Sequence, residues 1–279
     1  MPTIEIRGIP VNYQEAGAGR PVLLLHGMPV DHRHMVRAFE PILERRPGWR
    51  RIYPDLPGHG LTPRADWIST DDDKLEVALE LVDALAPGQR FLVIGASYGG
   101  YLALGAVHRR AADIDGVLLL VTNPLPEPTA LPPHRVFVRN DAVVASLVED
   151  ERGWLKVATV QSAEDLERFR TTILAAIRLA DHEFLDRVGP FTFPLVPLPE
   201  PFPRPALILN GREDSMTGYA DMLSLQESFP RGTFAILDRA GHALPSDRAV
   251  LFGVLVDDWL DRVEAEGPIR PSTPAAGGG

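Results

Sequence analysis

A chain of 279 residues that is 45% hydrophobic and 24% charged can bury a substantial core, and we expect one α/β domain that carries an insertion. The formal net charge is -10 and the basic residues are scattered, which argues against nucleic acid as a partner. The absence of cysteine excludes disulfides, thiolate metal sites and a cysteine nucleophile.

The N-terminus lacks the basic stretch followed by an apolar stretch that is typical of a secretion signal. No later segment reaches the run of about 18 apolar residues that a membrane-spanning helix needs. We therefore expect a cytoplasmic protein that does not enter a membrane and whose partner is a small-molecule substrate. Whether it is a monomer or a homodimer is left open.

The first half of the chain contains short apolar runs that predict strands. Residues 4–7 and 11–15 alternate in polarity around Gly8-Ile9-Pro10, as in a hairpin at the edge of a sheet. Residues 22–25 and 51–53 are rich in branched or aromatic residues, as in buried parallel strands. Apolar residues then recur at helical spacing at Leu75, Leu79, Val82 and Leu85.

A strand, a tight turn and a helix follow one another at residues 91–104. The run 91–94 leads into Gly95-Ala96-Ser97-Tyr98-Gly99, and Gly100-Tyr101-Leu102-Ala103 continues as a helix. Glycines two residues on either side of Ser97 allow a strained turn that presents its hydroxyl at the edge of the sheet. The helix start also directs backbone N–H groups toward negative charge beside Ser97. This pattern predicts Ser97 as the nucleophile.

About 80 residues separate the strand predicted at 117–121 from the next one, too many for a single loop. Within them, Ser162-Ala163-Glu164-Asp165 resembles a capping box, and Leu166, Phe169, Ile173 and Ile177 share one helical face. We interpret residues 125–203 as a helical cap over a core made of residues 1–124 and 204–263. The proline-rich borders of the cap favour stiff connections.

Two late strands each end in residues suited to activate a serine. Glu213 and Asp214 follow the run 206–209, and His242 follows the run 234–237. A serine hydroxyl needs a histidine to take its proton and an acid to orient that histidine. A last amphipathic helix contains Phe252, Leu255, Trp259 and Val263, and residues 264–279 read as a disordered tail.

These elements give an eight-stranded, mostly parallel sheet flanked by helices, with an inserted helical cap. In this order and spacing, the motifs around Ser97, Asp214 and His242 resemble the serine branch of the α/β-hydrolase superfamily from about Val22 to about Trp259. The resemblance implies the chain order serine, acid, histidine, and it favours Asp214 over Glu213 as the acid.

Two further turns match the same superfamily. They are His26-Gly27-Met28-Pro29 and Asp55-Leu56-Pro57-Gly58-His59-Gly60. For the first turn, the resemblance implies an oxyanion hole formed by the backbone N–H groups of Met28 and Tyr98. We expect His26 and His59 to brace their turns rather than to touch substrate.

The expected reaction is hydrolysis of a small carboxylic ester or lactone through an acyl-enzyme, with no cofactor and no metal. Apolar side chains expected at the substrate pocket, which favour a small uncharged substrate, are Met28, Tyr98, Phe137, Trp154, Phe169 and Phe184. Amides, thioesters, carbon–carbon hydrolysis, haloperoxidase-like and hydroxynitrile lyase-like reactions, and a slow-turnover ligand receptor stay open as alternatives.

Overall fold

One eight-stranded sheet organises the chain. The structure is a computed structural model, and it describes residues 1–267. The strand order is β1-β2-β4-β3-β5-β6-β7-β8, and all neighbours from β4 to β8 pair in parallel, whereas β1, β2 and β4 pair antiparallel. This confirms the predicted fold class. The strands are β1 Thr3–Ile6, β2 Ile9–Ala16, β3 Gly19–Leu25, β4 Gly48–Pro54, β5 Phe91–Ala96, β6 Ile114–Leu120, β7 Ala206–Gly211 and β8 Gly232–Leu237.

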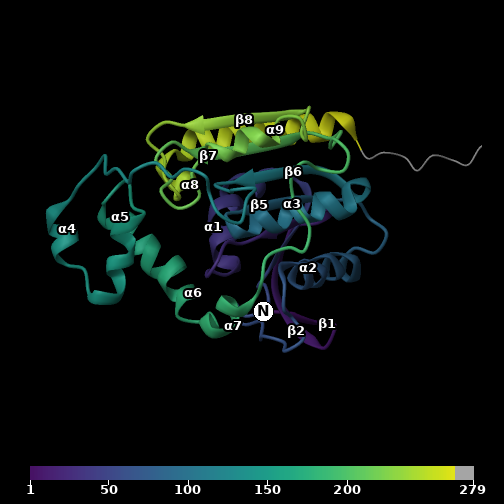
Figure 1. Cartoon of the computed structure of the whole chain (residues 1–279), viewed down its shortest axis with the longest axis horizontal. Coiled ribbons are helices and arrows are strands. Elements are labelled where there is room, and N and C mark those ends of the chain that lie inside the picture. The colour runs from purple at the N-terminus through teal and green to yellow at the C-terminus, as the bar shows by residue number, and fades with distance from the viewer. Residues whose placement is uncertain (268–279) are drawn as a thin grey trace, which may run out of the picture.

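Helices cover both faces of this sheet (Figure 1). On one face, α1 (His32–Leu43) and α9 (Ala249–Glu266) pack their apolar residues against alternate residues of β3, β5 and β6. On the other face, α2 (Asp71–Leu85) and α3 (Tyr98–Arg110) pack against the intervening residues. Because the central strands are buried on both faces, they read in the sequence as continuous apolar runs.

The segment between β6 and β7 contains short helices joined by irregular stretches, and it lies at one side of the sheet in Figure 1, coloured teal to green. The Ser162 hydroxyl accepts a hydrogen bond from Asp165 N–H at 3.0 Å, so the predicted helix start is confirmed. The helix from Ala163 to Ile177 contains a π-helical stretch, Phe169–Leu174. The helical elements of the whole segment between β6 and β7 are α4 Asp141–Ala145, η2 Glu149–Lys156, α5 Ala163–Arg168, η3 Phe169–Leu174, α6 Ala175–Ile177 and α7 His182–Arg187.

Two features differ from the sequence-based expectations. Helix α1 was not predicted, although Asp31 caps its start by accepting a hydrogen bond from Arg33 N–H at 3.0 Å. The predicted disordered tail begins too early at residue 264, because α9 continues to Glu266, whose carboxylate pairs with Arg204 at 3.1 Å. Residues 268–279 lie outside the described residues. Within residues 1–267, no helix is long and apolar enough to cross a membrane.

Candidate active site

Ser97 lies in the turn between β5 and α3 with a backbone φ of 54° and ψ of -120°. A non-glycine residue with positive φ is strained and persists only where its surroundings hold it in place. The Ser97 N–H donates to Leu120 O at 2.8 Å, and the Thr122 hydroxyl donates to Ser97 O at 3.3 Å. The end of β6 therefore fixes the turn.

The glycines around Ser97 are required by close backbone contacts. A Cβ atom at Gly95 would lie 2.1 Å from Gly99 O, and one at Gly99 would lie 2.1 Å from Leu25 O. The helix start is thus pressed against β5 on one side and against the end of β3 on the other. This explains the glycine spacing in the sequence by packing rather than by backbone dihedrals alone.

Asp214 and His242 meet across the ends of β7 and β8. The distance from His242 Nδ1 to Asp214 Oδ2 is 2.9 Å, and Asp214 is fully buried. Burial lowers the pKa of His242, but the charge of Asp214 and its hydrogen bond outweigh burial and raise that pKa above its ordinary value. The pair can therefore stabilise a protonated imidazole.

Asp214 is held as a carboxylate by further donors. Its Oδ1 accepts from Met216 N–H at 2.9 Å and Thr217 N–H at 3.1 Å, and its Oδ2 accepts from the Thr217 hydroxyl at 2.8 Å. Burial raises the pKa of Asp214, yet His242 and these donors lower it overall. The competing acid Glu213 instead accepts from Ala240 N–H at 3.2 Å. The geometry thus pairs His242 with Asp214 and not with Glu213.

The turn after β3 lies beside Ser97. A Cβ atom at Gly27 would lie 3.2 Å from Ser97 Cβ, so the backbone before Met28 passes close to the serine. Within residues 1–267, neither Met28 N–H nor Tyr98 N–H donates a hydrogen bond to a protein acceptor. His26 Nε2 accepts from Leu56 N–H at 3.0 Å, and its Nδ1 lies 2.7 Å from Gly27 O. His26 therefore braces the turn, as expected.

Asp55 holds the start of α1. Its carboxylate accepts from His32 Nδ1 at 2.7 Å, His32 N–H at 3.0 Å and Asn12 Nδ2 at 2.6 Å. Burial raises the pKa of Asp55, but the hydrogen bonds from His32 and Leu61 lower it to about 2. Asp31, His32 and Asp55 lie close enough to hold a cation, but these contacts already engage Asp55 in positioning the helix.

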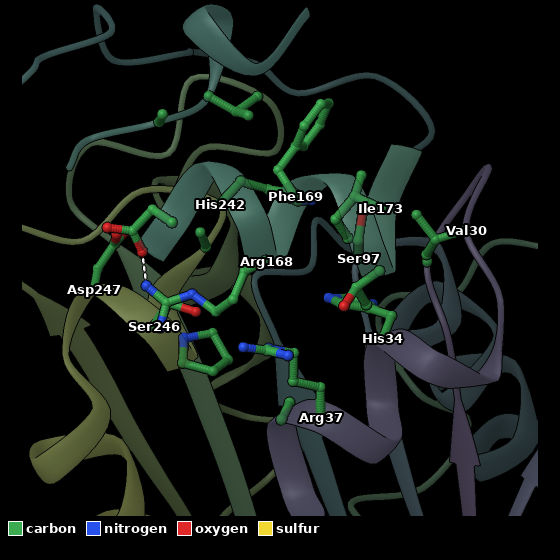
Figure 2. A pocket seen from close by; sticks show the side chains of 18 of the residues that line it. Val30, His34, Arg37, Ser97, Arg168, Phe169, Ile173, His242, Ser246 and Asp247 are labelled. Carbon is green, nitrogen blue, oxygen red and sulfur yellow. Dashed lines mark ion pairs between the residues drawn. The ribbon is translucent and has the colours of Figure 1, made fainter. Parts of the chain in front are cut away.

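A cavity of about 860 Å³ contains Ser97 and His242 in its wall (Figure 2). Of the pocket residues expected from the sequence, Met28, Trp154 and Phe169 line it. Phe137 and Phe184 do not, so those two predictions were wrong. Phe137 lies under the Arg239 guanidinium, 5.1 Å from its ring centre, and Phe184 is fully buried in the main core.

The side chain of Tyr98 is absent from the cavity lining as well, because its hydroxyl donates to the carboxylate of Asp71 at the start of α2. Phe184 faces the core because α7 docks on the first half of the chain, where Gly189 N–H donates to Ser69 O at 2.8 Å. The backbone N–H of Tyr98 is unaffected by this side-chain placement.

The cavity also contains polar residues that the sequence did not reveal. His34 and Arg37 reach it from α1, and Arg168 reaches it from α5. Burial, together with nearby His242, lowers the pKa of His34 to about 4, so His34 is neutral at pH 7. The available signal was Asp31 as a helix cap followed by Met35, Phe39 and Ile42 at helical spacing. The lining is mainly apolar, as expected, but the expectation that it holds few charges was wrong.

Comparison with known proteins agrees with this architecture. Residues 22–253 match the sequence model of a family described as the alpha/beta hydrolase family. A 2-hydroxymuconate semialdehyde hydrolase of Pseudomonas sp. (strain CF600) is 25% identical over 271 residues, covering 92% of this chain and 93% of that protein. A pimeloyl-acyl-carrier-protein methyl ester esterase of Legionella pneumophila (strain Paris) is 23% identical over 268 residues, covering 90% and 99%.

Solved structures give the same result. An alpha/beta superfamily hydrolase from Oenococcus oeni PSU-1 superposes with a TM-score of 0.82 at 27% identity, covering 91% of this chain and 96% of that one. A thermophilic esterase from Thermogutta terrifontis has a TM-score of 0.65 at 23% identity, covering 94% and 97%.

Proposed function

Because this chain belongs to the alpha/beta hydrolase family, we propose that it is a serine hydrolase that cleaves a small carboxylic ester or lactone. The observation that carries the proposal is the arrangement around one cavity. Ser97 occupies a strained turn in the cavity wall, and His242 in the same wall is hydrogen-bonded through Nδ1 to buried Asp214 at 2.9 Å. A nucleophile, a base and an orienting acid are thereby available together.

In the proposed reaction, His242 Nε2 takes the proton of Ser97 as Oγ attacks the substrate carbonyl carbon. The hydrogen bond from His242 Nδ1 to Asp214 keeps Nε2 free of a proton beforehand and stabilises the imidazolium that forms. The protonated histidine then gives its proton to the leaving alcohol. Water attacks the acyl-enzyme in the second half, with His242 again as the base.

The N–H groups of Met28 and Tyr98 are the proposed donors to the oxyanion. Their support is the absence of another protein acceptor within residues 1–267 and the closeness of the Gly27 backbone to Ser97. One such donor contributes roughly 2.7 to 4 kcal/mol to stabilisation of the transition state.

Hydrolysis of a carbon–carbon bond is the second candidate. It is favoured by the likeness to 2-hydroxymuconate semialdehyde hydrolase over 92% of this chain. The same three residues and the same oxyanion donors serve a ketone as well as an ester, so the bond cleaved depends on the leaving group that the cavity accepts.

The test is a panel of short esters, lactones and vinylogous diketones assayed with the native protein and with Ser97→Ala. We expect the native protein to hydrolyse at least one ester or lactone and to be labelled by a fluorophosphonate probe, and the variant to do neither. Turnover restricted to the diketones would move the assignment to carbon–carbon hydrolysis. Labelling that persists in Ser97→Ala would refute Ser97 as the nucleophile.

A further inference from the structure

Two arginine side chains line the cavity beyond Ser97. Arg37 comes from the middle of α1 and Arg168 from the end of α5, so one belongs to the core and the other to the segment inserted between β6 and β7. Figure 2 shows the two side chains extending into the same part of the pocket, with Ser97 and His34 to one side of them.

None of the acidic residues of the cavity forms an ion pair with Arg37 among residues 1–267. Glu40 pairs with Arg51 at 2.8 Å, Asp150 pairs with Arg178, and Asp247 accepts from Gly241 N–H at 2.8 Å. Burial raises the pKa of Asp247, and the charge of Asp247 raises the pKa of Arg168, so Asp247 acts on Arg168. Glu44, the remaining acid of the α1 wall, is exposed and lies roughly two helical turns beyond Arg37.

Arg168 has a partner, whereas Arg37 does not. Arg168 pairs with Asp165 on its own helix and, at 3.4 Å, with Glu164. Among residues 1–267, Arg37 forms no ion pair with a carboxylate. Arg37 is therefore an arginine of the cavity lining without an ion-pair partner among residues 1–267, at a place where two guanidinium groups face the same space.

The two guanidinium groups repel each other. Burial lowers the pKa of Arg168, and the charge of Arg37 lowers it further against the opposing effects of Glu164 and Asp247. An anion between the two side chains would remove this repulsion. A guanidinium donates two parallel hydrogen bonds to a carboxylate, and such charge-assisted bonds are about twice as strong as neutral ones.

We propose that Arg37 and Arg168 bind a carboxylate of the substrate, so that the chain acts on an ester or lactone that carries a free carboxyl group. A carboxylate fits better than a phosphate monoester because a single negative charge matches the single unpartnered positive charge. The choice of substrate rests on the proposed function, whereas the binding of a carboxylate does not. The proposed subsite replaces the expected uncharged substrate by an acidic one.

The first test compares two series of p-nitrophenyl esters of equal length, one ending in a methyl group and one in a free carboxylate. In the native protein, the best acidic ester should exceed its neutral counterpart in kcat/KM by about 10-fold to 100-fold. Arg37→Gln should reduce that ratio by about 10-fold or more. Arg45→Gln is the matched control, because Arg45 is an exposed arginine just after α1 that pairs with Asp257 outside the cavity.

The second test measures binding without turnover. Glutarate or adipate should raise the Tm of Ser97→Ala and of Ser97→Ala with Arg45→Gln, but not of Ser97→Ala with Arg37→Gln. Inorganic phosphate at the same concentration should give the smaller shift. An equal or larger shift with phosphate would overturn the assignment to a carboxylate.

The outcomes separate the two proposals. Equal kcat/KM for acidic and neutral esters, with hydrolysis intact, would overturn the carboxylate subsite and leave the proposed function in place. Carboxylate binding that depends on Arg37, together with no hydrolysis of any ester or lactone, would overturn the proposed function and leave the subsite in place.

Discussion

Replacing Asp214 by asparagine should remove activity through the protonation pattern of His242. The Asp214 Oδ1 position accepts two backbone N–H groups, from Met216 and Thr217, so an asparagine would keep its carbonyl oxygen there. Its amide NH₂ would then occupy the Oδ2 position and face His242 Nδ1. An N–H donor at that place requires Nδ1 to be an acceptor, which puts the proton on Nε2, where it blocks proton transfer from Ser97.

The expected loss in kcat is about 10⁴-fold, or roughly 5 kcal/mol of transition-state stabilisation. The assay is kcat and kcat/KM on the best ester, with fluorophosphonate labelling as a second readout. Glu213→Gln is the matched control, because glutamine can still accept the Ala240 N–H that Glu213 accepts at 3.2 Å. A larger loss in Glu213→Gln than in Asp214→Asn would refute this reasoning and make Glu213 the acid.

Three further predictions follow from packing and from pKa shifts. Gly99→Ala should lower the free energy of unfolding by about 3 kcal/mol or more, since the new Cβ would lie 2.1 Å from Leu25 O. Gly253→Ala on α9 should instead raise Tm slightly, because no atom lies within 4 Å of the position of its Cβ. Equal effects of the two variants in thermal melts would contradict the packing argument. In a pH profile of kcat/KM, the acid limb should have its midpoint above pH 6.5, because His242 must be neutral to act and Asp214 raises the pKa of His242. The variant His34→Gln should leave that midpoint in place, and a shifted midpoint would assign the acid limb to His34 instead. Lys74→Met should raise the free energy of unfolding at pH 7 by about 3 kcal/mol. Burial lowers the pKa of Lys74 from 10.5 to about 8, so its charge disfavours folding below pH 8, and this cost fades as pH rises toward 10.5. Denaturant melts at pH 7 and at pH 10.5 measure the gain, and no gain at pH 7 would mean that the contacts of the Lys74 ammonium with the rings of Tyr98 and Phe184 dominate.

The core of the fold was predictable because its signals are local. Buried parallel strands appear in the sequence as apolar runs. The turn around Ser97 is marked by glycines at positions where any Cβ atom would clash with neighbouring backbone. The partners of Ser97 were predictable for a related reason, since residues that directly follow parallel strands meet at one edge of the sheet. The pairing of His242 with Asp214 rather than Glu213 needed the structure, because adjacent residues differ only in the direction of their side chains.

The pocket was less predictable because its residues come together only when the segment between β6 and β7 packs against the rest of the chain. Aromatic side chains of the inserted segment carry no signal of which surface they will meet, so Trp154 and Phe169 reached the cavity while Phe184 entered the main core. Helix α1 was missed because its capping signal is followed by a polar stretch with Pro41 inside the helix. The omission matters, since this helix supplies both His34 and Arg37 to the cavity.

Helix α1 separates the proposed substrate-binding residue from the residues that carry the proposed chemistry. The strand ends that carry Ser97, Asp214 and His242 are fixed by backbone contacts of the sheet, so the reacting groups have little freedom to vary. Arg37, by contrast, is exposed at the cavity and forms no ion pair within residues 1–267, so its replacement would cost the fold little. Because Arg37 has no ion pair among these residues and lies with Arg168 in the cavity lining, the proposed ligand carboxylate would bind it without breaking a contact of the folded chain. Selectivity in this protein would then be set by residues that the fold is free to change, and chemistry by residues that it is not.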